Sequence, residues 1–171
     1  YQDELQNYTT PQLENLLNQL NNELQYYEDV LQHYNVTTAN IDIVIGIYDR
    51  IFDAKQSLSA ASQDLASNDI SDAISNLAYA KARIETLGDW LAVLNAIKGG
   101  APISENYLEE LTSMYLVYAQ SITEYTLSLS NAVGASSLLQ NMNSITQEVQ
   151  EAQNNYQRGL YSLALAQSLD V

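Results

Sequence analysis

Residues 10–34 read TPQLENLLNQLNNELQYYEDVLQHY, and this stretch decides the fold class. Its large apolar side chains recur every three or four residues, which places them on one face of a helix. They are Leu13, Leu16, Leu17, Leu20, Leu24, Tyr27, Leu31 and Tyr34. Thr10 followed by Pro11 is a common helix start, with a hydroxyl N-cap and proline at the first helical position. The stretch predicts a helix over about residues 11–34.

The same spacing continues through the chain and predicts four more long helices and a short last one. Their expected ranges are about 38–67, 70–98, 104–132, 136–157 and 160 onward. Three of them begin at side chains that can cap a helix, namely Thr38, Asp69 and Ser104. The turns carry residues that end helices: Asn68, Gly99, Gly100, Pro102, Gly134 and Gly159.

Gly46 lies inside the second predicted helix, where glycine costs up to about 1 kcal/mol relative to alanine. We expect either the close approach of a neighbouring helix or a weak point at this position.

Strand signals are absent, because no alternating run is bounded by turn residues. The sequence therefore predicts an all-α fold, an antiparallel bundle of about five long helices plus a short C-terminal helix. We expect one all-helical domain over residues 1–171. The last helix has no stop signal before Val171, so we also expect the chain to be a fragment of a longer protein.

A faint internal repeat appears when the chain is shifted by 91 residues. The shift aligns small or apolar residues of two helix–turn–helix segments: Ala61 with Ala152, Leu65 with Tyr156, Ser71 with Ser162, Ala73 with Ala164, and Ile74 with Leu165. Small residues let helices pack closely, as in tetratricopeptide-like hairpins. The tetratricopeptide pattern is incomplete and no 34-residue period runs through the chain, so chance similarity between two alanine-rich turns remains the other interpretation.

Composition and charge exclude several classes. Hydrophobic residues make up 46% of the chain, which fits a folded domain. No apolar run approaches 18 residues, so no transmembrane segment is predicted. The net charge of −15 disfavours nucleic acid and anionic lipid as partners. Scarce lysine, abundant Tyr, Ser, Thr and Asn, and no cysteine are typical of archaeal extracytoplasmic proteins, and the sequons at Asn7 and Asn35 support this only slightly.

The sequence offers little for catalysis. His33 is the only histidine and there is no cysteine, which excludes the usual zinc sites. The neighbours Glu28 and Asp29 point to different helix faces, as do Glu109 and Glu110, and we expect solvated surface charges there. Glu148 and Glu151 share a face, and the same interpretation applies to them. We therefore predict no catalytic residue, no cofactor and no metal, and no enzyme activity in this chain.

Thirteen tyrosines stand against one phenylalanine and one tryptophan. Tyrosine combines apolar area with a hydroxyl and is favoured at recognition surfaces. Six tyrosines on two of the predicted helices form the candidate binding surface: Tyr26, Tyr27, Tyr34, Tyr115, Tyr118 and Tyr125. The other interpretation is that these side chains fill the half-buried margins of the core.

The segment LASNDISDAISNLAYAKARIETL, Leu65–Leu87, resembles helical segments that follow the protease domain in archaeal membrane-associated Lon-like serine proteases. The downstream GDWL and APISENYLEELTSMYLVYAQSITEY stretches are similar in the same loose way. The resemblance covers the middle third to half of the chain and includes no catalytic motif. It implies a helical extracytoplasmic appendage of a protease whose Ser–Lys dyad lies outside this sequence.

Three functions stay open at this point. The first is a non-catalytic accessory or interaction domain of a larger extracytoplasmic protein, secreted or anchored through a missing segment. Its partner would be another protein, other domains of the same polypeptide, or a second copy. The second is a free-standing module that binds a peptide or small ligand in a tyrosine-lined groove. The third, an enzyme, would need two carboxylates that face each other in a cleft.

Overall fold

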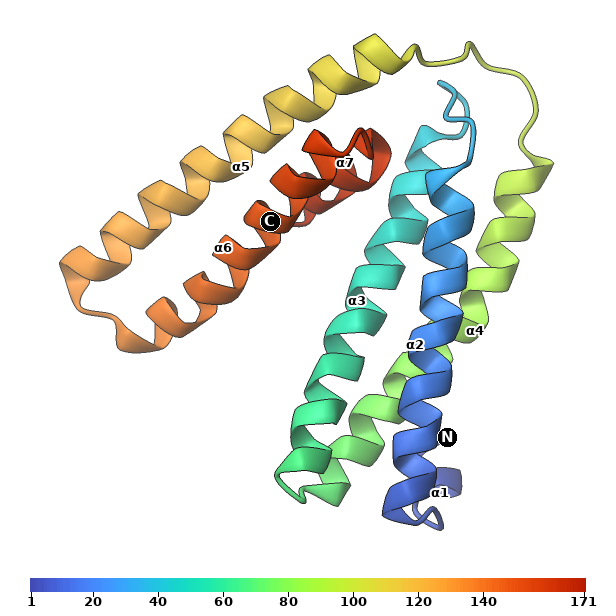
Figure 1. Cartoon of the computed structure of the whole chain (residues 1–171), viewed down its shortest axis with the longest axis vertical. Helices are drawn as coiled ribbons and strands as arrows, with labels where there is room; N and C mark the ends of the chain where they lie inside the picture. The colour runs from blue at the N-terminus through green and yellow to red at the C-terminus, as the bar shows by residue number, and fades with distance from the viewer. The chain divides into compact units, whose positions relative to one another are not determined.

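The computed structural model describes the backbone of residues 1–171 and all side chains except those of Ser136 and Ser137. Over these residues the chain is helical without a strand, which confirms the all-α prediction (Figure 1). The helices are α1 (Gln2–Leu5), α2 (Thr10–Gln32), α3 (Ile41–Ala66), α4 (Ile70–Ala96), α5 (Glu105–Val133), α6 (Ser136–Gln157) and α7 (Tyr161–Asp170).

The chain divides into two compact units. Unit 1 comprises Tyr1–Asn35 and Ala39–Gly100, and unit 2 comprises Val36–Thr38 and Ala101–Val171. Unit 1 holds α1 to α4, and unit 2 holds α5 to α7. The prediction of a single domain over residues 1–171 stays a prediction, and each unit is described by itself below.

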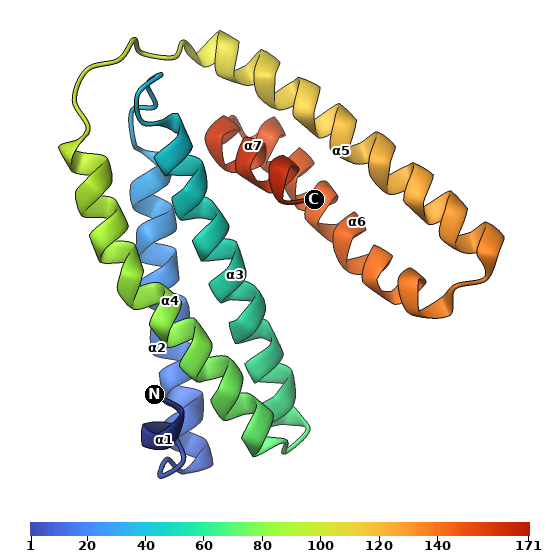
Figure 2. The same cartoon turned by 180° about the vertical axis from the view of Figure 1, so that it is seen from behind.

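In unit 1, α2, α3 and α4 lie side by side with alternating directions (Figures 1 and 2). Each buries one apolar face, because side chains that recur every three or four residues lie on the same side of a helix and are removed from water together. Leu16 and Leu17 of the face predicted for α2 are half-buried. The largest fully buried side chains are Leu13, Leu20, Leu24 and Leu31 of α2, Ile47, Tyr48, Ile51 and Leu58 of α3, and Leu77, Ile84 and Leu87 of α4, with Leu5 of α1.

In unit 2, α6 returns along α5, and α7 reverses direction again and packs on both (Figures 1 and 2). One buried cluster between α5 and α6 consists of Leu116, Ala119, Val149 and Ala152, and unit 2 also buries Met142 of α6 and residues 163–166 of α7. Tyr156 and Val171 cover this cluster from its edge. Short side chains dominate it, so each large one matters for the stability of the unit.

The sequence missed α1, because four residues are too few to show a helical period. Leu5 anchors this turn and is fully buried. The hydroxyl of Tyr1 donates a hydrogen bond to the carboxylate of Glu85 in α4. The ammonium of Lys81 lies 4.2 Å from the centre of the Tyr1 ring.

The predicted cap of the first long helix was wrong by one residue. Thr9 rather than Thr10 caps α2: its hydroxyl accepts from the amide of Gln12, and the Gln12 side chain accepts from the amide of Thr9. This reciprocal pair satisfies two amides that have no partner inside the helix. Gln12 supplied a capping-box signal that favours Thr9 over Thr10.

The predicted helix cap at Thr38 was also wrong, because Thr38 forms hydrogen bonds with Ala101 and not with an amide of α3. Its hydroxyl accepts a hydrogen bond from the amide of Ala101, and its own amide donates to the carbonyl of Ala101. α3 begins three residues later at Ile41, after Asn40. Thr37 and Pro102 form an isolated antiparallel bridge, the one such pairing among the described residues. Thr38 therefore holds the start of unit 2 in place.

The start signals at Asp69 and Ser104 and the stop at Gly134 are confirmed, whereas the predicted stop at Gly99 and Gly100 was wrong, because α4 already ends at Ala96 with extended Ile97 as its C-cap. The carboxylate of Asp69 accepts from the amide of Asp72, and the hydroxyl of Ser104 accepts from the amide of Tyr107. Gly134 ends α5 in the left-handed conformation. These contacts satisfy amides and carbonyls that helix ends leave without partners.

The segments aligned by the 91-residue shift have the same turn geometry. Asn68 and Gly159 are both left-handed, with φ of 60° and 76°. The four backbone hydrogen bonds around each turn correspond one to one: Ser67 to Gln63, Asn68 to Leu65, Asp69 to Asp64 and Ala73 to Asp69 in the first, and Arg158 to Asn154, Gly159 to Tyr156, Leu160 to Asn155 and Ala164 to Leu160 in the second.

Side chains reproduce the same correspondence across both hairpins. Asn76 donates to the Asp64 carboxylate at 2.8 Å, and Asn155 donates to the Gln167 side-chain oxygen at 2.9 Å. The shift places Asp64 on Asn155 and Asn76 on Gln167. Each hairpin is thus closed by one polar bridge at equivalent positions, so the α3–α4 and α6–α7 turns are built by the same local rules.

The close approach expected at Gly46 was wrong, since a Cβ added there would meet no atom within 4 Å. We predict that Gly46→Ala stabilises unit 1 by about 0.7 kcal/mol, because alanine loses less backbone entropy on folding. The matched variant Asn68→Ala should destabilise it by about 1 kcal/mol, because alanine resists the left-handed backbone. Urea unfolding followed by circular dichroism measures both, and a destabilised Gly46→Ala variant would contradict the prediction.

Candidate functional site

Helix α5 fully buries mostly small and polar side chains, keeps Leu108, Leu111, Tyr115 and Leu127 half-buried, and exposes most of its other large apolar ones. Its buried residues are Thr112, Leu116, Ala119, Thr123 and Ser130, among which only Leu116 is large and apolar. Its exposed apolar residues are Tyr107, Met114, Val117, Tyr118, Ile122, Tyr125, Leu129 and Val133. Soluble domains usually show the reverse distribution, and a contiguous exposed apolar surface marks a site of interaction.

Six of the exposed side chains share one face of the helix. We call Met114, Tyr118, Ile122, Tyr125, Leu129 and Val133 the α5 stripe. They follow one another at steps of four, four, three, four and four residues. At about 100° per residue, these steps keep them within one face, about a third of a turn away from the buried face. Tyr125 is 70% exposed and Tyr118 is 64% exposed.

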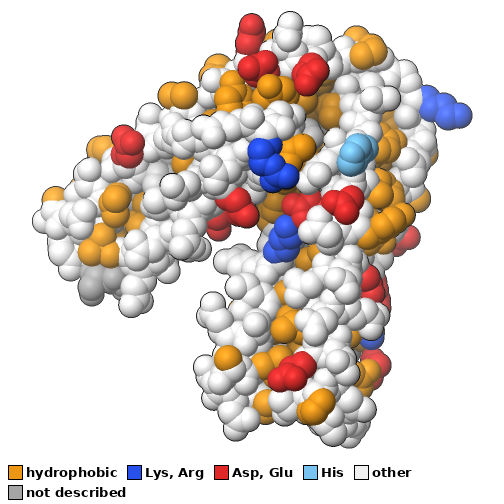
Figure 3. Space-filling model, in the orientation of Figure 1, with side chains coloured by type: hydrophobic (Ala, Val, Ile, Leu, Met, Phe, Trp, Pro, Cys, Tyr) orange, Lys and Arg blue, Asp and Glu red, His pale blue; other side chains and the backbone are white. Residues whose placement is uncertain are grey.

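The stripe lies in a segment that carries almost no charge. Between Leu111 and Gln147 the sequence has a single charged residue, Glu124. In Figure 3 the end of the α5–α6 hairpin that lies toward the turn between the two helices, at the left of the view, is mostly white and orange, with few red or blue side chains. In a chain with a net charge of −15, this neutral apolar segment is the surface that another protein approaches with the least repulsion.

The buried side of α5 fixes the orientation of the stripe. The hydroxyl of Thr112 lies 2.6 Å from the carbonyl of Leu108 and 3.1 Å from that of Tyr161, which ties α5 to the start of α7. Thr123 and Ser130 donate to carbonyls one turn earlier and so satisfy their buried hydroxyls within the helix. Small residues there let α6 and α7 pack closely, which leaves the large residues on the other side.

A groove of about 610 Å³ runs beside the N-terminal end of the stripe. Tyr156 of α6 forms one wall, and α5 supplies the remaining lining residues: Asn106, Glu109, Glu110, Ser113, Met114 and Val117. Met114 belongs to both the groove and the stripe. The groove combines apolar side chains with two carboxylates, so a segment bound on the stripe could extend into it with a polar or basic end.

The structure places the six predicted tyrosines in both units. Tyr118 and Tyr125 are exposed on α5, and Tyr115 is half-buried. On α2, Tyr26 is exposed and packs edge-to-face against half-buried Tyr27, with 5.4 Å between ring centres. Half-buried Tyr34 donates to the side-chain oxygen of Asn95 at 2.9 Å. The six therefore include both surface and margin residues.

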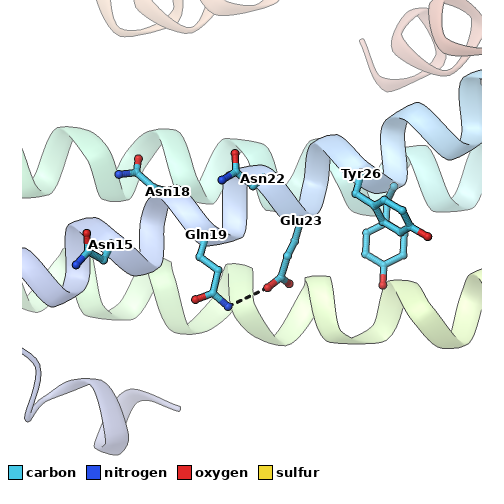
Figure 4. Close-up of a pocket in the computed structure, with 7 residues that line it drawn as sticks. Asn15, Asn18, Gln19, Asn22, Glu23 and Tyr26 are labelled. Carbon is cyan, nitrogen blue, oxygen red and sulfur yellow. Dashed lines mark hydrogen bonds between the residues drawn. The ribbon is translucent and has the colours of Figure 1, made fainter.

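A shallow groove of about 620 Å³ runs along α2 (Figure 4). It is lined by Asn15, Asn18, Gln19, Asn22, Glu23, Tyr26 and Tyr27. The amide of Gln19 donates to the Glu23 carboxylate at 3.1 Å. Burial, followed by the charge of Glu23, raises the pKa of Tyr27, which keeps its hydroxyl protonated and able to donate. The groove offers carboxamides and phenol rings, which suit a polar, uncharged ligand.

The carboxylates do not all behave as predicted. The expectation of solvated charge was wrong for Glu28, which is only 7% exposed and forms a 2.6 Å ion pair with Lys55 of α3. The helical period had already placed Leu24 and Leu31 on the buried face, and Glu28 lies between them at the same spacing. A carboxylate on that face needs a cation beside it. Its role here is to join α2 and α3.

Glu148 of α6 is half-buried rather than fully solvated. Burial raises the pKa of Glu148, and the nearby charges of Asp170 and Glu151 raise it further. A raised pKa in the folded state means that the ionised form opposes folding. The contribution of Glu148 to stability is present below the usual glutamate pKa and is lost as the pH rises through its folded-state pKa.

We therefore predict that Glu148→Gln stabilises unit 2 at pH 7. The gain should shrink as the pH falls and vanish below about pH 4, where the wild-type carboxyl is protonated in both states. Thermal unfolding of both proteins between pH 7 and pH 4 measures the difference. Exposed Glu124→Gln is the control and should show no such trend. A Glu148→Gln variant that is less stable than wild type at pH 7 would refute the assignment.

His33 lies exposed at the C-terminal cap of α2, as its position near the end of the predicted helix suggested. Its Nδ1 atom lies 2.8 Å from the carbonyl oxygen of Asp29. Among the described residues, no group of three or more His, Cys, Asp or Glu side chains is arranged to hold a metal ion.

Comparisons add no relative to this description: neither a protein-family model nor a curated protein nor a solved structure matches the chain. The resemblance to Lon-like proteases therefore stays a prediction. Within the described part of the chain, no helix has the length and hydropathy that a membrane span requires.

Sequence reasoning found two members of the stripe, Tyr118 and Tyr125, and missed the other four. The missing signal was the spacing that joins them to Met114, Ile122, Leu129 and Val133. That spacing predicts an apolar face but gives no indication that this face stays exposed. Whether this face is exposed or buried depends on where α6 and α7 pack, and the hydrophobic period of α5 alone does not specify that.

Proposed function

We propose that this chain is a non-catalytic helical interaction domain of a larger extracytoplasmic protein, and that it binds protein through the α5 stripe. The observation that carries the proposal is the distribution of side chains on α5, whose buried residues are threonine, alanine and serine apart from Leu116, while eight large apolar side chains are exposed. Exposed tyrosines and methionine beside charge-free surface have the composition of a protein-binding core. The low lysine content and abundant Tyr, Ser, Thr and Asn support an extracytoplasmic location.

Photo-crosslinking tests this function directly. Benzoylphenylalanine replaces Tyr125 of the stripe in one variant and Tyr26 of α2 in the other, since both tyrosines are exposed. Irradiation in the cells that make the protein should give a discrete protein adduct at position 125 and none at position 26. Absence of any adduct at position 125, or equal adducts at both, would overturn the proposal.

The α2 groove supports a second function, the binding of a peptide or small polar ligand. Carboxamides of Asn18 and Asn22 and the ring of Tyr26 follow one another along α2 and all line the groove, which suits hydroxyl- or amide-bearing ligands (Figure 4). A thermal-shift screen with neutral peptides and sugars tests it. A shift that is lost in Asn22→Ala would favour this function, and no shift with any ligand would reject it.

The Lon-like resemblance supports a serine protease as the parent protein. The helical unit would then present or position a partner for a catalytic domain located elsewhere in the polypeptide. The full encoded sequence tests this: a protease domain with a Ser–Lys dyad before Tyr1 supports it, and a parent without a protease domain contradicts it.

A further inference from the structure

We propose that the α5 stripe is the interface of a homodimer in which the α5 helices of two copies pack antiparallel. This inference rests on the proposed function, because it names a second copy of the chain as the partner of the same surface. Four features carry it: the symmetry of the spacing, the placement of charge along α5, the size of the stripe, and the acidity of the rest of the molecule.

The spacing of the stripe reads the same in both directions. Its steps of four, four, three, four and four residues map onto themselves when the helix is reversed. A two-fold axis across the helix therefore brings Ile122 opposite Tyr125, Tyr118 opposite Leu129, and Met114 opposite Val133 of the other copy. Such a contact is isologous and closes after two copies, as in most homodimers.

The charges along α5 favour the antiparallel direction. Glu105, Glu109 and Glu110 lie in its first two turns, and Glu124 is the one acidic residue in the rest of the helix. A parallel pair would set all four glutamates beside their own copies, whereas in the antiparallel pair only Glu124, next to the dyad, lies near its own copy. The antiparallel pair sets the acidic end of one helix beside the charge-free C-terminal end of the other, and the helix dipoles oppose each other favourably.

The stripe has the size that a specific dimer needs. A stable interface buries about 800 Å² on each partner, and its core is rich in tyrosine, methionine and aliphatic residues. Six large side chains, each 43–70% exposed, supply a substantial part of that area, and neighbouring Ser, Thr, Asn and Gln supply a neutral polar rim. Elsewhere the net charge of −15 opposes the approach of two copies.

Sedimentation equilibrium of the full chain between about 1 µM and about 100 µM covers micromolar dissociation constants. The expected species has twice the 19.0 kDa mass of one chain. Because salt screens the repulsion between two acidic copies, added NaCl should tighten the dimer. A wild-type chain that stays monomeric over this range overturns the proposal. Binding of the monomer to neutral phosphatidylcholine vesicles, in place of a second copy, overturns it equally.

Two substitutions locate the interface. Ile122→Glu should produce a monomer with an unchanged helical circular-dichroism spectrum, because it buries two charges at the dyad. The milder Tyr118→Ala should weaken the dimer by about tenfold or more. The control is Val93→Glu on α4, where the valine is half-exposed, and it should stay dimeric. A dimer that survives Ile122→Glu would place the contact elsewhere and reject the stripe.

Disulfide trapping tests the direction, since the chain has no cysteine of its own. Mixed Met114→Cys and Val133→Cys chains should crosslink to each other on oxidation, and neither should crosslink to itself. The two positions lie about 28 Å apart along one helix, so self-crosslinking would require parallel packing and would contradict the proposal.

Failure of this inference is distinguishable from failure of the proposed function. A monomer whose position 125 photo-crosslinks to a different protein keeps the interaction domain and rejects the homodimer. A monomer without any adduct at position 125 rejects both.

Discussion

Leu116→Ala should destabilise unit 2 by about 3 kcal/mol, through lost apolar burial and the cavity left behind. Leu116 is 5% exposed and is the one large apolar side chain that α5 buries. Its neighbours Ala119 and Ala152 are too small to fill the space, and Val149 is the only other large member of the cluster. Because this cluster holds few large buried side chains, truncating its leucine removes a large share of its apolar contacts.

Hydrogen exchange followed by mass spectrometry measures which helices lose stability in the Leu116→Ala variant. Exchange should accelerate in residues 105–170, while the amides of α2, α3 and α4 should keep their protection. Tyr125→Ala, on the same helix, removes an even larger side chain and, in protein diluted until it is monomeric, should change the free energy of unfolding by less than about 0.5 kcal/mol. Equal destabilisation by the two variants would mean that the stripe, too, supports the fold of the single chain.

Lys55→Met should destabilise unit 1 by about 2 kcal/mol, because it leaves the Glu28 carboxylate buried without its cation. The two groups are 2.6 Å apart, with 9% of the Glu28 side chain and 43% of the Lys55 side chain exposed. Water reaches the lysine, so the loss falls below that of a fully buried pair. The measurement is urea unfolding at pH 7.

A double-mutant cycle separates pairing from packing. The Glu28→Gln, Lys55→Met double variant should regain about half of the stability lost by Lys55→Met alone, since no charge is then left buried. Lys81→Met removes the ion-pair partner of an exposed glutamate, Glu4, and the cation over the Tyr1 ring, and should cost about 1 kcal/mol or less. A Lys55→Met variant as stable as Lys81→Met would show that Glu28 does not depend on its partner.

The helices were predictable because their signals are local. Apolar side chains every three or four residues set α2 to α6, and Asn68 and Gly134 ended helices by tolerating a left-handed backbone. The errors arose where two local choices competed. Thr9 and Thr10 can both cap α2, and the reciprocal bond with Gln12 selects Thr9.

Non-local contacts account for the remaining errors. Thr38 forms its hydrogen bonds with Ala101, 63 positions away in the sequence, and the Glu28 carboxylate is paired on the buried face of α2 by Lys55 of α3. Gly46 lies in open space, which no sequence pattern indicates. Each outcome depends on the presence or absence of neighbours that are distant in the sequence.

The candidate surface was predictable only in part, for the same reason. Tyr118 and Tyr125 suggest recognition by their chemistry, whereas Tyr27 and Tyr34, of the same type, are half-buried. Residue type gives the capacity to bind. Packing of α6 and α7 on the small-residue face of α5 decides which tyrosines stay exposed to a partner.

Hydroxyl-radical footprinting of side chains tests the central claim, that the α5 stripe is a contact surface, most directly. The oxidation rates of Met114, Tyr118 and Tyr125 are compared between assembled protein and protein diluted until it is monomeric, or between protein with and without its crosslinked partner. The account predicts several-fold slower oxidation of these three residues in the assembled state, with unchanged rates at exposed Tyr26 and Tyr79. Protection at Tyr26 with Tyr118 and Tyr125 unchanged would contradict it.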